Sequence, residues 1–135
     1  MKIRIISSRE EINSIRPNEK AVHLAFRASN VDFLNLLQKV PRLQMVQVPP
    51  SYMKTMSKAI EVFLEMQGVK LLQGDVWGHR KDIDEYFTVP DEALTAIKSM
   101  NKEGAAPEMI AKEVQKKTKL GSELIKFIAQ AEIAA

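Results

Sequence analysis

The residues best suited to chemistry lie close together near the middle of the chain. Between and just after two glycines, at positions 74 and 78, the sequence places a carboxylate, the only tryptophan, an imidazole and a guanidinium: Asp75, Trp77, His79 and Arg80. A loop that holds these groups together could transfer protons or bind an anion. The same residues could instead be structural, with Trp77 covering the edge of a sheet and Asp75 holding a turn. Both interpretations stay open.

Several other chemistries are excluded or disfavoured. The chain has no cysteine, so it can form no disulfide, thiolate metal site or cysteine nucleophile. Asp75 and His79 offer two metal ligands without a third at a recognisable spacing, and we expect neither a metal nor a cofactor. No glycine-rich phosphate loop follows a strand, which excludes nucleotide binding by the standard loops. His23 lies within an apolar run, where we expect a buried, hydrogen-bonded imidazole.

Alternating short β-branched runs and amphipathic segments must position these groups. Strands are predicted to begin near residues 2, 21, 43 and 69. The intervening helices are a short one opened by Ser8, one over 31–39, and a long one over 52–67. Strands separated by helices pair in parallel through right-handed crossovers. We therefore predict an α/β fold with a four-stranded, mainly parallel sheet, doubly wound in preference to a stacked β–α superhelix.

Parallel strands deliver the loops after their carboxyl ends to one edge of the sheet, where α/β proteins bind ligands. At this edge the sequence predicts an anion site formed by Arg27, Ser29, Ser51, Asp75, Trp77, His79 and Arg80. Arginine side chains near helix N-termini favour phosphate or carboxylate groups. A second interpretation of the same loop is catalytic, with Asp75 and His79 transferring protons.

After Pro90 the pattern becomes entirely helical, which divides the chain into an α/β sheet domain over 1–89 and a helical subdomain over 90–135. Three predicted helices with a glycine-containing break have the outline of a helix-turn-helix. Lysines on the second and third helices are candidate nucleic-acid contacts: Lys112, Lys116, Lys119 and Lys126. However, the third helix has no arginine. The second helix, expected over 107–119, is longer than the second helix of a compact helix-turn-helix. Helix packing or contact with a protein partner explains the same pattern.

Composition and charge limit the class of protein. The 135 residues are 45% hydrophobic and 27% charged, which excludes disordered and low-complexity chains. The net charge is +3, and residues 91–135 carry 7 basic and 7 acidic side chains, so bulk charge gives nucleic-acid binding no support. No apolar run reaches the length of a membrane span and no signal peptide is recognisable. We expect a cytoplasmic protein that does not enter membranes.

Four segments carry a resemblance to a known family. They are residues 9–11 (REE), 22–27 (VHLAFR), 51–53 (SYM) and, most distinctively, 74–83 (GDVWGHRKDI). Across nearly the whole chain the sequence resembles an archaeal family of unknown function found mainly in methanogens. The resemblance implies an archaeal, cytoplasmic protein and assigns no activity and no role to any residue.

Two functional hypotheses follow. The first is a non-enzymatic binding or regulatory module that acts through its C-terminal helices on a protein partner or on nucleic acid. The alternative is a small enzyme or an anion- or phosphate-binding protein with its site in the loop from Asp75 to Arg80. The alternative requires Asp75, His79 and Arg80 to converge with Arg27 on an open cleft, whereas the first requires an exposed basic or apolar face within residues 107–130.

Overall fold

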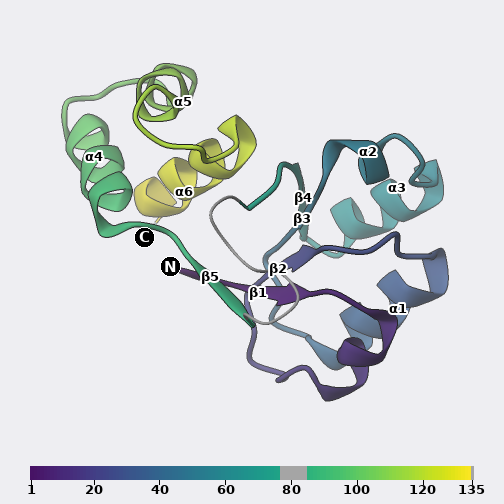
Figure 1. Cartoon of the computed structure of the whole chain (residues 1–135). Coiled ribbons are helices and arrows are strands. Elements are labelled where there is room, and N and C mark those ends of the chain that lie inside the picture. Colours follow the sequence, from purple (N-terminus) through teal and green to yellow (C-terminus); the bar gives the residue numbers. More distant parts are fainter. Residues whose placement is uncertain (77–84, 135) are drawn as a thin grey trace.

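A five-stranded sheet lies at the centre of the molecule, with helices on both of its faces (Figure 1). The structure is a computed structural model that describes residues 1–76 and 85–134. Its strands are β1 (Lys2–Ile6), β2 (Ala21–Leu24), β3 (Met45–Val48), β4 (Lys70–Gln73) and β5 (Tyr86–Thr88). The spatial order is β4-β3-β2-β1-β5.

The first four strands pair in parallel, which confirms the predicted crossovers. The predicted count of four strands is one too few, because β5 adds to the sheet antiparallel to β1. Tyr86, Phe87 and Thr88 all favour strands, yet three residues are too short a run for a periodic pattern to be recognised.

The order of the strands corrects the predicted winding. From β1 to β4 every crossover steps to the next strand in the same direction, so right-handed crossovers place all the connecting helices on one face. These helices are η1 (Arg9–Ser14), α1 (Asn30–Lys39), α2 (Pro50–Met53) and α3 (Lys58–Met66). A doubly wound sheet would place them on both faces, and that expectation is wrong.

The second face is covered by the C-terminal helices α4 (Asp91–Lys102), α5 (Pro107–Gln115) and α6 (Ser122–Ala134), which Figure 1 shows on the opposite side of the sheet from α1 and α3. Side chains alternate between the two faces along each strand. Ile3, Met45 and Leu72 therefore pack with the C-terminal helices, whereas Val22 and Val46 pack with η1, α1 and α3. Covering both faces explains why the parallel strands are so apolar.

Two predicted helices are shorter in the structure. The helix expected over 52–67 is divided, because Ser57 caps a new helix at Lys58: its Oγ accepts a hydrogen bond from the backbone N–H of Ile60 (3.2 Å). Serine at such a position satisfies a free N–H at a helix start and competes with continuous helix. The second C-terminal helix, expected to reach residue 119, ends at Gln115.

Candidate functional site

Arg27 and Ser29, two residues of the predicted anion site, line the same cavity. The cavity has a volume of about 320 Å³ and lies beyond the carboxyl ends of β2 and β3, between the start of α1 and the α2–α3 segment. Ser51 is exposed on α2 and does not line it. Asp75 lines a different cavity. Trp77, His79 and Arg80 lie outside the described residues, so their place in the predicted site stays a prediction.

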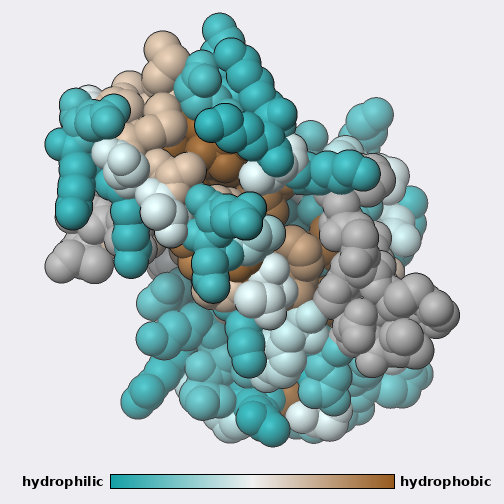
Figure 2. Space-filling model, turned by 60° about the vertical axis from the view of Figure 1, so that its left-hand side comes forward, coloured by the Kyte–Doolittle hydropathy of each residue, from teal (hydrophilic) through white to brown (hydrophobic). Residues whose placement is uncertain are grey.

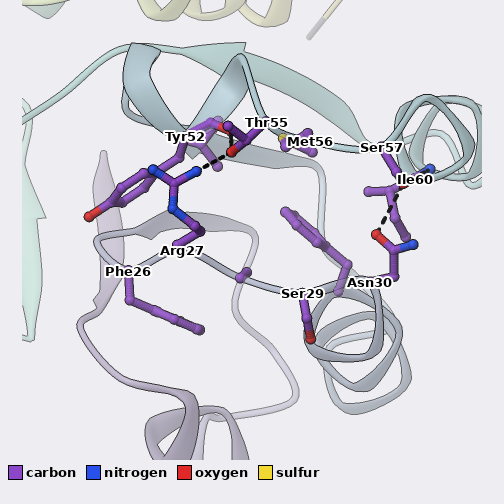
Figure 3. Close-up of a pocket in the computed structure, with 12 residues that line it drawn as sticks. Phe26, Arg27, Ser29, Asn30, Tyr52, Thr55, Met56, Ser57 and Ile60 are labelled. Atoms are coloured by element: carbon purple, nitrogen blue, oxygen red, sulfur yellow. Dashed lines mark hydrogen bonds between the residues drawn. The ribbon is translucent and has the colours of Figure 1, made fainter.

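Arg27 is exposed and is held by two neutral groups from α2 and the turn after it (Figure 3). Its Nη1 donates a hydrogen bond to Oγ1 of Thr55. Its guanidinium carbon lies 5.0 Å from the centre of the Tyr52 ring. Neither partner carries a charge, and Arg27 takes part in none of the ion pairs found between described residues. The positive charge therefore has no protein counter-ion within the described part of the chain.

The far side of the cavity is tied together by Asn30 and Ser57 (Figure 3). Ser57 donates from its Oγ to Oδ1 of Asn30 over 3.0 Å. This bond joins the first residue of α1 to the N-cap of α3, so two helix N-termini border the cavity. Each N-terminus carries a partial positive charge from the aligned peptide dipoles. Thr55 and Ser57 were not predicted as site residues, because the undivided helix over 52–67 concealed the turn that brings them here. Asn30 and Tyr52 were expected at this edge of the sheet but were not chosen as site residues.

Apolar side chains make up most of the remaining wall, among them Phe26, Phe33 and Met56. The twelve described residues that line the cavity include no aspartate, glutamate or lysine, so Arg27 is the one formally charged group among them. This part of the cavity thus combines an apolar, partly aromatic interior with a guanidinium at its rim.

A carboxylate does lie near the start of α1, but it is already paired. Asp32 accepts hydrogen bonds from Arg9 Nε and from the backbone N–H of Ser29, each over 2.8 Å. Burial of the Asp32 carboxyl opposes its ionisation, but the hydrogen bonds from Arg9 and Ser29 outweigh burial and hold its pKa below the ordinary value. Asp32 is therefore an anion at neutral pH that anchors the helix start to Arg9 and leaves Arg27 uncompensated.

His23 and Gln47 form a buried polar pair on the face of the sheet that carries α4–α6, opposite the face that carries α1 and α3. His23 is completely buried, and its Nδ1 lies 2.8 Å from Oε1 of Gln47, which confirms the predicted hydrogen-bonded imidazole. Its Nε2 lies 3.5 Å from Oδ1 of Asp75. Asp75 also borders a cavity of about 290 Å³ together with residues of α4 and the α5–α6 turn. The structure thus places Asp75 on the face that carries α4–α6, and Arg27 on the other.

The predicted lysine contacts lie around the turn between α5 and α6. Lys112 is on the last part of α5, Lys116 is its C-cap, and Lys119 is in the turn; all three are exposed. Lys116 also forms an exposed ion pair with Glu113 (3.2 Å). Lys126 is half-buried on α6. The prediction missed Lys117, which is exposed in the same turn, because it does not fit a helical stripe; the run Lys-Lys-Thr-Lys over 116–119 was the available signal.

The last helix, α6, is packed between the sheet and the other C-terminal helices. Leu124, Ile125 and Ile128 are buried in the core that α4–α6 share with the sheet. The carboxylate of Glu123 accepts a hydrogen bond from the backbone N–H of Gln73 in β4 (3.1 Å). Figure 2 turns the side that carries these helices forward and shows hydrophilic side chains surrounding a limited hydrophobic area. Every residue from 122 to 129 is buried or half-buried, so little of this part of α6 is exposed.

Among the residues that the structure describes, no three histidine, aspartate or glutamate side chains gather closely enough to hold a metal ion. No helix within the described ranges is long and apolar enough to cross a bilayer.

The fold and the helical arrangement define a protein with an α/β sheet domain followed by a compact three-helix domain. Residues 2–85 match a family of unknown function, DUF1699, in its N-terminal domain, and residues 92–130 match the C-terminal HTH (helix-turn-helix) domain of the same family. The chain belongs to the DUF1699 family. The sequence resemblance to a family of unknown function is confirmed to this extent. No curated protein and no solved structure matches the chain.

Proposed function

We propose that this chain is a non-enzymatic nucleic-acid-binding module whose turn between α5 and α6 contacts phosphate groups. The observation that carries the proposal is the group of exposed lysines in and before this turn, Lys112, Lys116, Lys117 and Lys119, within a segment that matches a helix-turn-helix domain. In a helix-turn-helix, the second helix and the start of the third approach the backbone and the groove of the duplex.

The even balance of charge in residues 91–135 conceals an uneven distribution. Residues 112–126 contain five lysines and two glutamates, whereas Asp91, Glu92, Glu103 and Glu108 all precede this segment. One end of the helical domain is therefore basic, although the domain as a whole is neutral. A local group of lysines is sufficient for phosphate contacts, which supply most of the affinity of sequence-independent binding.

The geometry favours contacts to phosphates over contacts to base edges. Sequence is read by side chains that reach the bases from an exposed recognition helix. Here α6 would be that helix, and Glu123 on its first turn is hydrogen-bonded to β4 while Lys126 is half-buried. We therefore expect binding with little sequence preference as long as α6 stays on the sheet.

Salt titration of duplex binding tests this proposal. The full chain is titrated onto a labelled random-sequence duplex of about 24 base pairs, and the logarithm of affinity is plotted against the logarithm of salt concentration. In the triple variant Lys116→Gln, Lys117→Gln, Lys119→Gln this negative slope should become shallower by about 2 to 3. Each phosphate contact contributes about −0.9 to the slope, and the variant loses three.

A matched control separates a local contact from a change in overall charge. Lys39→Gln, Lys54→Gln, Lys58→Gln removes the same three charges from exposed positions of the α/β domain. This control should bind almost as the wild type does. If both triple variants weaken binding equally, or if the wild type does not bind at 50 mM salt, the helical domain does not contact nucleic acid through this turn, and contact with a protein partner becomes the better hypothesis.

From the resemblance carried by residues 74–83 we also infer an archaeal source and a cytoplasmic location. The alternative function, an enzyme or anion site in the loop from Asp75 to Arg80, stays a prediction, because most of that loop lies outside the described residues. Such a site would not include Arg27, since Asp75 and Arg27 line different cavities.

A further inference from the structure

We propose that the cavity beside Arg27 binds a small organic monocarboxylate whose body is aromatic or otherwise flat and apolar. The proposal is independent of nucleic-acid binding, since the cavity lies on the face of the sheet that carries α1 and α3, away from the α5–α6 turn.

Arg27 supplies the recognition of the carboxylate. The planar guanidinium presents several N–H donors that match the two oxygens of a carboxylate, and only Nη1 is occupied by Thr55 among the described contacts. The ring of Tyr52 supports the other side of the group (5.0 Å). These two contacts fix the direction of Arg27 before a ligand arrives, which reduces the conformational entropy that binding would cost.

The charge of the cavity selects a monoanion. Among the described residues of the lining, Arg27 is the one with a formal charge, so a carboxylate would be neutralised by it. A phosphate monoester carries a charge of about −1.5 to −2 at neutral pH and would retain excess negative charge against an apolar wall. The partial charges of the helix ends are weak and are partly used, because Asp32 already lies in the first turn of α1.

The walls select the body of the ligand. Phe26, Phe33 and Met56 offer flat aromatic and polarisable surfaces in the wall of the cavity. Aromatic groups stack favourably on such surfaces, and methionine adapts to their shape. The Asn30 side chain accepts from Ser57 through Oδ1 (3.0 Å), which leaves its Nδ2 amide as a second donor at the far rim. A volume of about 320 Å³ is at the small end of ligand cavities, which suits a one- or two-ring molecule.

The probe is 2-naphthoate, with 2-naphthamide as its uncharged analogue of the same shape. Calorimetric titration of the full chain should show one site for 2-naphthoate and at least about tenfold weaker binding of the amide, since a charge-assisted hydrogen bond is replaced by a neutral one. In ¹H–¹⁵N NMR spectra, the largest changes should fall on the backbone amides of 27–30 and 52–57.

Variants of two exposed arginines identify the contact. Arg27→Gln should lower the affinity for 2-naphthoate at least about tenfold and should bind the acid and the amide alike. Arg42→Gln, in the loop between α1 and β3, removes the same charge far from the cavity and should bind as the wild type does. Circular dichroism should show both variants folded, because both side chains are exposed.

Three outcomes would overturn the proposal. One is the absence of 2-naphthoate binding to the wild type at millimolar concentration. Another is equal affinity of the wild type for the acid and the amide, which would mean that the cavity binds apolar molecules whether or not they carry a charge. The third is tighter binding of 2-naphthyl phosphate than of 2-naphthoate, which would replace the monocarboxylate with a phosphate ester.

Discussion

Glu123, on the first turn of α6, accepts a hydrogen bond from the backbone N–H of Gln73 at the carboxyl end of β4 (3.1 Å). Among the described strands β4 lies at the edge of the sheet, and none of them pairs with its outward N–H groups. The bond therefore does two things at once: it satisfies a donor of the sheet edge and holds the helix-turn-helix domain against the α/β domain.

Replacing Glu123 with alanine should free the Gln73 amide without unfolding the protein. Because Gln73 is exposed, water can replace the lost acceptor, and we expect a loss of no more than about 1 kcal/mol in the free energy of unfolding. Hydrogen exchange followed by NMR should show faster exchange at Gln73. Glu113→Ala, which removes an exposed partner of Lys116, is the control and should leave Gln73 unchanged. Unchanged exchange of Gln73 in Glu123→Ala would show that the bond does not hold α6 in solution.

Gly74 is required by the side chain of Gln47. A Cβ added at Gly74 would lie 2.6 Å from Nε2 of Gln47, a buried side chain whose Oε1 is held 2.8 Å from Nδ1 of His23. Gly74→Ala should therefore displace Gln47 and lower the free energy of unfolding by about 1–3 kcal/mol. At Gly121 the nearest atom would be 3.5 Å away, an ordinary contact, so Gly121→Ala should cost much less. Urea unfolding of the two variants measures the difference, and equal stability would contradict this explanation of Gly74.

The sequence predicted the parallel pairing well because it depends on strong local signals. Short strand segments rich in β-branched residues, such as 45–48, and their separation by helices of ordinary length require crossovers, whatever the order of the strands. The winding could not be predicted in the same way. It depends on whether each crossover steps left or right along the sheet, and the local sequence pattern carries no signal for that direction. In the structure the C-terminal helices cover the second face, and η1, α1 and α3 share the first.

The residues of the candidate site could be predicted only in part, because some of them are brought together by contacts between distant parts of the chain. Arg27 and Ser29 could be predicted from their position after β2, since the end of a parallel strand points to the ligand-binding edge. Tyr52 and Thr55 could not, because their contact with Arg27 depends on the break before Ser57. A serine in an amphipathic run is compatible with continuous helix. In the structure Ser57 instead caps α3 by accepting from the backbone N–H of Ile60, and it donates to Asn30, 27 residues earlier in the chain.

The buried pair of His23 and Gln47 should contribute to stability through its hydrogen bond. Gln47→Met keeps a side chain of similar length but removes the acceptor that lies 2.8 Å from Nδ1 of His23. A buried donor without an acceptor costs about 1–3 kcal/mol, and urea unfolding should show a loss of this size. Gln44→Met, at an exposed position just before β3, is the control and should change stability little. A Gln47→Met variant as stable as the wild type would show that the amide adds nothing beyond packing.

The pH dependence of stability should report on Asp32. Burial of its carboxyl opposes ionisation, but the hydrogen bonds from Arg9 and Ser29 prevail and lower the pKa in the folded state. A carboxyl with a lowered folded pKa stabilises the protein fully above its unfolded pKa, and this contribution is lost as the pH falls through the folded value. Asp32→Asn keeps an acceptor for Ser29 but removes the charge beside Arg9, and it should be less stable than the wild type by about 1 kcal/mol at pH 7. Urea unfolding at a series of pH values should show this difference constant from pH 7 to about 5 and shrinking towards pH 2.

Asp91→Asn, which replaces an exposed acid in the first turn of α4, is the control for the Asp32 variant. A difference for Asp32→Asn that stays the same down to pH 2 would mean that the Asp32 charge, and its pairing with Arg9, does not stabilise the fold.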